Sequence, residues 1–365
     1  MADLFDPMTL PRGPAWRNRL MLAPLTNLQS HEDGRLSEDE FRWLTMRAAG
    51  GFGLVMTCAA YVQRVGQGFP GQLGVFEDAQ LEGLERLARA IRAAGAVSSV
   101  QLHHAGIRSP AALTGTQPVG PSEDAETGAR ALSEDEVEAL IEDFVAAATR
   151  AEQAGFDGVE LHGAHGYILC AFLSPQTNRR EDRFGGAPDK RATILWEIIE
   201  GVRQRCRGDF QLGVRLSAER FGLATAEMRA LAAELMTSGK IDYLDMSLWD
   251  VFKTPVEPAF AEKPLIDWFA DLPRGRTRLG AAGKILTATG ARETLAHRAD
   301  YAILGRAAIL HHDWPRRAAE DPDFASATLP VSAEYLRAEG LGEAFLGYMR
   351  GWKGFVAEDT AAALT

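Results

Sequence analysis

Cysteine is scarce in this chain of 365 residues. Cys58, Cys170 and Cys206 stand far apart and form no Cys-x-x-Cys pair, which excludes a disulfide framework and an evident zinc or iron–sulfur set. Long apolar runs are also missing, because no stretch reaches the roughly 18 residues of a membrane-spanning helix. The first residues, MADLFDPMTLPRG, have acidic side chains and no apolar centre, unlike a secretory signal. We therefore expect a cytoplasmic protein.

Positive charge is in the minority. The chain has 39 Lys and Arg against 50 Asp and Glu, a net charge of −11. This balance argues against a protein made mainly to bind nucleic acid or an anionic membrane. An anionic cofactor would need a few cations placed locally. The hydrophobic fraction of 46% and charged fraction of 24% are typical of a globular protein.

Eight apolar segments alternate with stretches of helical periodicity. Several are almost continuously apolar, as in parallel strands covered on the outside. The expected strands are 19–24, 53–62, 97–104, 158–163, 211–218, 243–248, 277–283 and 301–306. Such repeats predict an α/β TIM (β/α)8 barrel. A doubly wound sheet is the alternative, but no Gly-x-Gly-x-x-Gly motif lies between the first strand and a helix.

Helix ends and long loops can also be placed. The motif Ser-Glu-Asp-Glu occurs at 37–40 and 133–136, and each copy predicts an N-cap serine with a capping box. The loop 107–132, rich in Pro and Gly, is expected to shape the mouth of an active site. We expect one domain, 1–365, with long βα loops, an N-terminal lid segment at 1–18 and a helical C-terminal tail at 330–365.

Two histidines and a tyrosine mark the fourth expected strand. His162 stands at its C-terminal end, and His165 and Tyr167 follow in the next loop. Barrel enzymes carry their chemistry at that end. Two imidazoles can donate to one oxygen and stabilise charge that develops on it. A tyrosine, with an ordinary pKa of about 10, is a proton donor at neutral pH. The group suits protonation beside a polarised carbonyl.

Two other interpretations of the histidines were weighed. His-x-x-His can bind a metal, but Glu160 is expected to point to the opposite strand face from His162 and no third ligand is nearby in the sequence, so no metal is expected. Two purely structural histidines are the ordinary expectation for isolated residues. Their clustering with Tyr167 at a strand end favours a functional role.

Polar and small residues mark other strand ends. Polar groups on strands one, three and five suit the edges of a flat heteroaromatic ring, and an arginine there could stabilise negative charge on a reduced ring. Glycines and an arginine at strands seven and eight suit a phosphate. The residues concerned are Thr26, Gln101, Arg215, Gly283, Gly305 and Arg306. Together they predict a phosphorylated ring cofactor.

From about residue 3 to 355 the chain resembles the Old Yellow Enzyme family of NADH:flavin oxidoreductases. The family pattern Ser-Pro-x-x-Asn-x-Arg-x-Asp-x-aromatic-Gly-Gly is met from Ser174 to Gly186, after His-x-x-His-x-Tyr. The stretches NRLMLAPLTN, VQLHHAG and AILGR match further family segments in order. The run from Asn178 to Gly186 is interpreted as a structural clamp of charge pairs and turn glycines.

The resemblance implies non-covalent FMN, with NADPH or NADH as reductant. Hydride would pass through the flavin to an alkene conjugated to a carbonyl or nitro group, and quinones are further candidate acceptors. By position, His162 and His165 would hold the substrate oxygen, and Tyr167 would protonate the α-carbon. Thr26 would contact the flavin carbonyl near N5. The cofactor-binding residues would be Pro24, Thr26, Ala59, Gln101, His162, Arg215, Gly283, Gly305 and Arg306.

The chain departs from family members at three places. Leu28 replaces a tyrosine found in some of them, Arg108 is displaced by one position behind Ile107, and Arg350 is expected on a helix surface. Trp249 or Phe252 is a candidate for the pocket wall, with loops 62–75, 107–132 and 249–262.

Two alternatives stay open at this point. One is a flavin-free barrel isomerase or lyase using His162 and Tyr167 for proton transfer, and the other is an FMN-binding redox sensor. The expected partner is a small electron-poor alkene, with no nucleic acid and no membrane. The sequence leaves a homodimer or higher homo-oligomer open.

Overall fold

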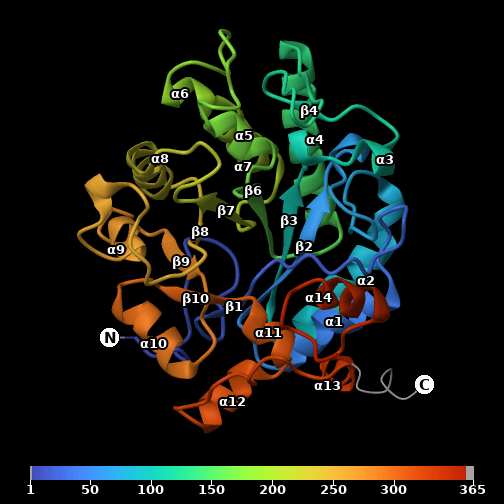
Figure 1. Cartoon of the computed structure of the whole chain (residues 1–365), viewed down its shortest axis with the longest axis vertical. Coiled ribbons are helices and arrows are strands. Elements are labelled where there is room, and N and C mark those ends of the chain that lie inside the picture. The colour runs from blue at the N-terminus through green and yellow to red at the C-terminus, as the bar shows by residue number, and fades with distance from the viewer. Residues whose placement is uncertain (1, 359–365) are drawn as a thin grey trace.

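The computed structural model describes residues 2–358, and its central feature is a closed barrel of parallel strands (Figure 1). The barrel strands are β1 (Leu20–Leu22), β2 (Leu54–Tyr61), β3 (Val97–His103), β6 (Gly158–Gly163), β7 (Gln211–Ser217), β8 (Tyr243–Ser247), β9 (Arg278–Ala282) and β10 (Tyr301–Leu304). Their order is β1-β10-β9-β8-β7-β6-β3-β2, and β1 closes the ring by pairing with β2. All eight expected strands and the TIM barrel are confirmed.

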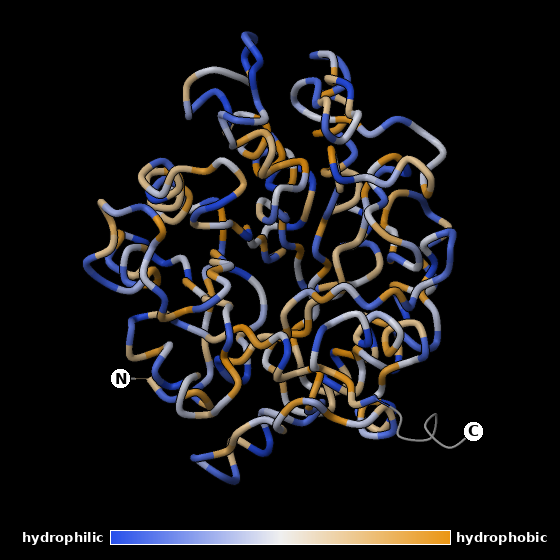
Figure 2. The backbone as a smooth tube through the Cα atoms, in the orientation of Figure 1, coloured by the Kyte–Doolittle hydropathy of each residue, from blue (hydrophilic) through white to orange (hydrophobic). Residues whose placement is uncertain are grey.

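Helices surround the barrel. Those that follow the strands or extend the loops are α1 (Glu38–Ala49), α2 (Leu81–Ala93), α3 (Ala111–Thr114), α4 (Glu134–Gln153), α5 (Ile168–Leu173), α6 (Pro188–Arg191), α7 (Thr193–Arg205), α8 (Thr225–Thr237), α9 (Leu265–Ala270), α10 (Ala288–Ala296), α11 (Arg306–Leu310), α12 (Trp314–Glu320), α13 (Ala333–Ala338) and α14 (Glu343–Arg350). Hydrophobic segments gather toward the middle and the outer tips are mostly hydrophilic (Figure 2). Within residues 2–358, no helix combines the length and apolar character needed to cross a bilayer.

One of the two predicted capping boxes is wrong. At α4, Ser133 accepts from the Glu136 N–H and the Glu136 carboxylate accepts from the Ser133 N–H, as expected. At α1, Ser37 caps the helix, but the buried Glu40 carboxylate accepts from Asn27 and Ser30 instead. The reason is tertiary, because the loop after β1 brings two better placed donors to Glu40.

The N-terminal segment covers the barrel floor, at the N-terminal ends of the strands. Trp16 packs edge-on against Tyr243 and Tyr301, with ring centroids 5.6 and 4.9 Å apart. Its indole N–H donates to Gln211 Oε1 at 3.1 Å. The segment 1–18 was expected as a lid. Its buried anchor, Trp16, lies at the end of the barrel opposite the strand C-termini.

The C-terminal tail packs beside α1 (Figure 1). Phe345 of α14 meets Trp43 of α1 edge-on, with ring centroids 4.9 Å apart. The helical character expected for 330–365 is present in α13 and α14, and 359–365 lie outside the described residues. This packing brings α14 to the C-terminal side of the barrel strands.

The loop after β3 carries a small sheet of its own. Strands β4 (Val119–Gly120) and β5 (Arg130–Ala131) pair in parallel inside the expected 107–132 loop. Arg180 pairs with Asp182 and donates to the carbonyl of Pro121 at 3.0 Å. Asn178 donates to the carbonyls of Phe172 and Phe184, both at 2.7 Å. The predicted structural clamp is confirmed, and it ties the loop after β6 to the β4 region.

Candidate active site

A cavity of about 620 Å³ opens at the C-terminal ends of the barrel strands. It collects side chains and backbone from residues far apart in the sequence. Every candidate site residue from the sequence lines it: Pro24, Thr26, Ala59, Gln101, His162, His165, Tyr167, Arg215, Gly283, Gly305 and Arg306. Their meeting in one cavity follows from the barrel, because parallel strands deliver all their C-terminal ends to one face.

His162, His165 and Tyr167 form one wall of the cavity. The ring centroids of His162 and His165 lie 5.0 Å apart, and that of Tyr167 lies 5.1 Å from His162. His162 Nε2 and His165 Nδ1 are 3.3 Å apart. His165 has φ of +62°, and its backbone N–H donates to Ser217 Oγ at 3.1 Å. A non-glycine residue in this conformation is strained, as is common in functional loops.

Burial decides the charge state of these groups. It lowers the pKa of His162 well below its usual range, with a smaller contribution from His165. Burial, assisted by Arg215 and Arg108, lowers the pKa of His165 to about 3. Burial raises the pKa of Tyr167, against the opposing charge of Arg108. At neutral pH the wall therefore offers two neutral imidazoles and a protonated phenol.

A third histidine, which sequence reasoning missed as a site neighbour, lies beside Tyr167. The His103 ring meets the Tyr167 ring edge-on, with centroids 4.4 Å apart. His103 Nδ1 is 3.1 Å from Gln72 Nε2, and burial lowers the His103 pKa well below its usual range. The signal was present in the sequence, since His103 ends the third strand in VQLHHAG.

The barrel interior below the cavity holds a charged network. Gln101 Nε2 donates to Glu160 Oε1 at 2.8 Å, and Arg215 Nε lies 3.1 Å from Asp245 Oδ2. The expectation that Glu160 points to the opposite face from His162 is wrong: Glu160 faces inward like His162, because residues two apart on a strand share a face. Asp245 had no signal beyond its place in an apolar strand.

This network contains two buried carboxyls and one guanidinium. Burial, and then the charge of Asp245, raises the pKa of Glu160 to about 8. Burial raises the pKa of Asp245 to about 6, against the charge of Arg215. Since Arg215 pairs directly with Asp245, we assign the proton at neutral pH to Glu160. Arg215 Nε is buried and has an ion-pair partner but no aligned hydrogen-bond acceptor within residues 2–358.

Residues at the cavity mouth complete the lining. Phe69, Arg108 and Trp249 come from the three loops expected to form the walls. Phe252 was the other candidate from its loop, but it packs against His297, with ring centroids 5.4 Å apart, and is not part of the lining. Arg350 is exposed at the end of α14, as expected.

The contribution of the C-terminal tail to the cavity was not foreseen. Phe345, Tyr348, Met349 and Trp352 line it from α14 and the turn that follows. Sequence periodicity places such residues on one helix face but does not say which surface that face meets. The surface that α14 meets is decided by contacts between residues that are distant in the sequence.

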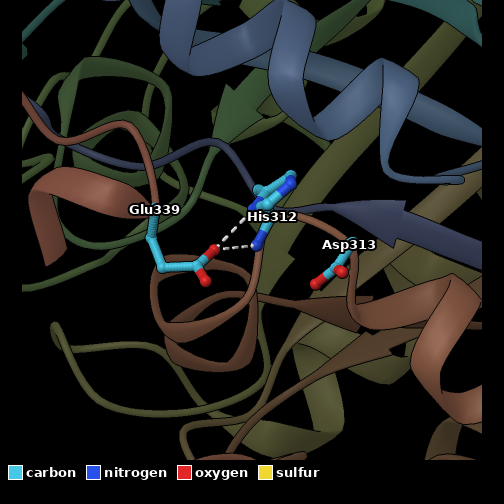
Figure 3. Close-up of side chains that lie close together, drawn as sticks. All are labelled: His312, Asp313 and Glu339. Atoms are coloured by element: carbon cyan, nitrogen blue, oxygen red, sulfur yellow. Dashed lines mark hydrogen bonds and ion pairs between the residues drawn. The ribbon is translucent and has the colours of Figure 1, made fainter. Parts of the chain in front are cut away.

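A separate cluster of possible metal ligands is formed by residues that lie between α11 and α14 in the sequence. His312 donates from its backbone N–H and from Nδ1 to Glu339 Oε2, at 2.6 and 2.7 Å (Figure 3). Asp313 accepts from Arg317 at 2.8 Å. Both carboxylates are thus engaged by protein donors, and the cluster anchors the C-terminal tail.

The cavity suits a flat, phosphorylated ring. Ala23 and Ala59 are small, while Gln101 and Arg215 present polar groups to the lining. Gly305 follows β10, the neighbour of β1, and a Cβ placed there would make only ordinary contacts, with Leu25 Cδ2 at 3.5 Å and Ala23 Cβ at 3.9 Å. Arg306 follows directly. A TIM barrel with such a cavity and a His/His/Tyr wall defines a flavin-dependent oxidoreductase.

The chain belongs to the NADH:flavin oxidoreductase / NADH oxidase family, whose model matches residues 3–323. It is 37% identical over 322 residues to the Bacillus subtilis protein named "Probable NADH-dependent flavin oxidoreductase YqiG", covering 85% of this chain and 86% of that one. It is 33% identical to an NADPH dehydrogenase of Bacillus licheniformis over 328 residues, covering 87% and 94%. The solved structure of an Old Yellow Enzyme homologue from Zymomonas mobilis superposes with a TM-score of 0.78 at 28% identity, covering 92% and 96%.

The resemblance to the Old Yellow Enzyme family is thereby confirmed. The protein is an FMN-dependent NAD(P)H oxidoreductase of the ene-reductase type. The flavin-free isomerase or lyase is set aside by this result, and the binding-only redox sensor is not supported by it.

Proposed function

We propose that this enzyme reduces the C=C bond of alkenes conjugated to a carbonyl or nitro group, with Tyr167 as the proton donor. The observation that carries the proposal is the wall of two neutral imidazoles and one protonated phenol in a single cavity. A reduced flavin supplies hydride to the β-carbon when it is bound. The protein must then bind the activating oxygen and deliver a proton to the α-carbon.

His162 and His165 bind the activating oxygen in this proposal. Each neutral imidazole has one N–H to donate, and their facing nitrogens are 3.3 Å apart without substrate. A substrate oxygen that enters between the rings accepts from them and withdraws electron density from the alkene. Donors aimed at an oxygen where charge develops lower the barrier most in a site shielded from water.

Tyr167 delivers the proton. Its raised pKa keeps the phenol protonated well above neutral pH. The positive charge of Arg108, with its guanidinium carbon 4.9 Å from the Tyr167 ring centroid, opposes this shift and eases proton release. A donor in this position supports protonation of the carbon next to the polarised carbonyl.

The cofactor residues divide into two groups. Pro24, Thr26, Ala59, Gln101 and Arg215 would hold the flavin ring, and Arg215 would balance negative charge on it. Gly283, Gly305 and Arg306 would hold the phosphate, through backbone N–H groups and one guanidinium. The proposed phosphate residues all follow β9 and β10, whereas the proposed ring residues are spread over β2, β3, β7 and the segment after β1.

The test is turnover under anaerobic conditions. The flavin is first reduced with NADH or NADPH, and 2-cyclohexenone, a nitroalkene and a quinone are then offered in turn. We expect reoxidation by the first two with formation of the saturated product. His162→Ala should lose binding of the enone while retaining flavin. A wild-type enzyme that reduces only the quinone would overturn the alkene proposal.

A further inference from the structure

The charge of the cavity lining is opposite to that of the whole protein. The chain has a net charge of −11. The lining contains the cations Arg108, Arg215, Lys284 and Arg306, and no Asp or Glu among the described residues. When all the charged side chains of a pocket are cationic, the pocket attracts anions even in an acidic protein, because the local field acts at short range.

Three of these cations already have roles. Arg215 pairs with Asp245 at 3.1 Å, and Lys284 pairs with Asp250 at 2.9 Å. Arg306, next to Gly305, is assigned to the cofactor phosphate. Arg108 has no carboxylate within ion-pair distance in residues 2–358, and its one side-chain hydrogen bond there runs from an Nη to the His165 carbonyl at 2.5 Å.

Arg108 lies on the opposite side of the barrel from the residues proposed to hold the cofactor phosphate. It ends the turn that follows β3, whereas Lys284 and Arg306 follow β9 and β10. In the closed order of strands, β3 and β6 are neighbours. Two strands, β7 and β8, separate β6 from β9, and two others, β2 and β1, separate β3 from β10. Arg108 therefore belongs to a different part of the cavity rim from Gly305, and it stands on the wall of His165 and Tyr167.

The position of Arg108 is also fixed. Its bond to the His165 carbonyl holds one edge of the guanidinium, and its carbon lies 4.9 Å from the Tyr167 ring centroid. The other guanidinium N–H groups have no acceptor in the described part of the chain, and Arg108 is an exposed residue of the cavity lining. A planar guanidinium held in this way is suited to bind a carboxylate.

We propose that Arg108 forms an anion subsite, and that the preferred substrates are activated alkenes that also carry a carboxylate. The proposal rests on the proposed function, since the activating carbonyl or nitro oxygen still binds between the imidazoles. Neutral histidines cannot balance a second, anionic group on the substrate. The Arg108 guanidinium can balance that charge, and it lies beside Tyr167, the proposed proton donor.

A matched pair of substrates tests the proposal. The pair is trans-4-oxo-2-pentenoate and its methyl ester, which share the enone and differ in charge. We expect wild-type enzyme to prefer the acid in kcat/KM, with a preference that weakens as salt is added. Arg108→Gln should lower the acid-to-ester ratio of kcat/KM by about 10- to 100-fold, mainly through KM for the acid. An effect of Arg108 on proton release by Tyr167 changes both compounds alike and cancels in this ratio. Arg108→Lys should recover part of the loss.

A charge control and a cofactor control complete the design. Arg220, whose guanidinium carbon lies 4.6 Å from the Trp249 ring centroid, is outside the lining, so Arg220→Gln should leave the acid-to-ester ratio unchanged. Equal losses for acid and ester in Arg108→Gln would overturn the subsite and leave Arg108 as a support for His165. If Arg108→Gln lost activity only with NADPH, while activity with NADH and with the acid was unaffected, Arg108 would be assigned to the 2′-phosphate of NADPH. That result would also overturn the carboxylate subsite. If wild-type enzyme reduces neither compound, the proposed function itself fails.

Discussion

His165 Nε2 lies 2.8 Å from Ser247 Oγ, although 82 positions separate the two residues in the chain. Ser247 ends β8, and its hydroxyl also accepts from an Nη of Arg215 at 3.4 Å. One hydroxyl therefore connects the imidazole wall with the Arg215 guanidinium, which we propose faces the flavin ring. The orientation of His165 depends on a strand that carries none of the residues proposed from sequence.

Removing that hydroxyl should impair substrate binding. In Ser247→Ala the His165 ring loses a fixed partner, and a single neutral hydrogen bond contributes about 1 kcal/mol. We expect kcat/KM for 2-cyclohexenone to fall by about 5-fold. Steady-state kinetics give this value, with flavin content and Tm as controls for an intact fold. Wild-type kinetics in this variant would show that Ser247 does not position His165.

Tyr167→Phe should separate proton transfer from hydride transfer. Loss of a general acid costs about 100-fold or more in rate, so alkene reduction should fall by at least that factor. Quinone reduction should continue, because it needs no proton on carbon from the protein. Tyr348→Phe removes the same hydroxyl from another residue of the lining and should leave both rates near wild type.

The result would count against Tyr167 in one case. If Tyr167→Phe kept full alkene reduction while His162→Ala lost enone binding, the donor assignment would be wrong and the oxygen-binding pair would stand. Rapid-mixing measurements of the reduced enzyme with 2-cyclohexenone distinguish these outcomes.

The proton on Glu160 predicts a pH dependence of stability. Its folded pKa of about 8 lies above the value of the unfolded chain. The folded state then holds a proton that the unfolded state releases, so this stabilising contribution is complete below about pH 4 and is lost as pH rises toward the folded pKa. The slope is at most about 1.4 kcal/mol per pH unit for one group.

Glu160→Gln should flatten this dependence. The amide keeps the contact with Gln101 and cannot ionise, so unfolding free energies at pH 5, 6.5 and 8 should differ less than in wild type. Urea unfolding with FMN in constant excess measures them. Glu85→Gln, at an exposed position of α2, removes an acidic side chain elsewhere and should retain the wild-type slope. Parallel profiles for wild type and Glu160→Gln would place the proton elsewhere.

Arg306→Gln tests the phosphate end of the cavity. Loss of a charge-assisted hydrogen bond should weaken FMN binding by about 10- to 100-fold. Riboflavin has the same ring and no phosphate, so its affinity should stay within about twofold of wild type. Titration of apoprotein by flavin fluorescence measures both. Equal weakening of FMN and riboflavin would contradict a phosphate role for Arg306.

Much of the barrel and its site could be predicted from local patterns. A buried parallel strand is apolar along most of its length, so segments such as 211–218 and 301–306 can be recognised as strands. Once the strands are placed, His162 and Arg215 fall near strand C-termini, where the topology brings them together. The clamp from Asn178 to Gly186 was likewise visible in its local contacts, such as Asn178 with Phe184, whereas its bond from Arg180 to Pro121 spans 59 positions.

The sequence by itself determined the barrel and the identity of the polar groups at its mouth, since both follow from the periodicity of single strands. Only the tertiary structure decided that Glu40 turns away from its helix cap, that Ser247 meets His165, and that α14 forms part of the cavity. Each of these is a contact between segments distant in the chain. Their geometry depends on how whole helices and strands pack, and no local pattern encodes that packing.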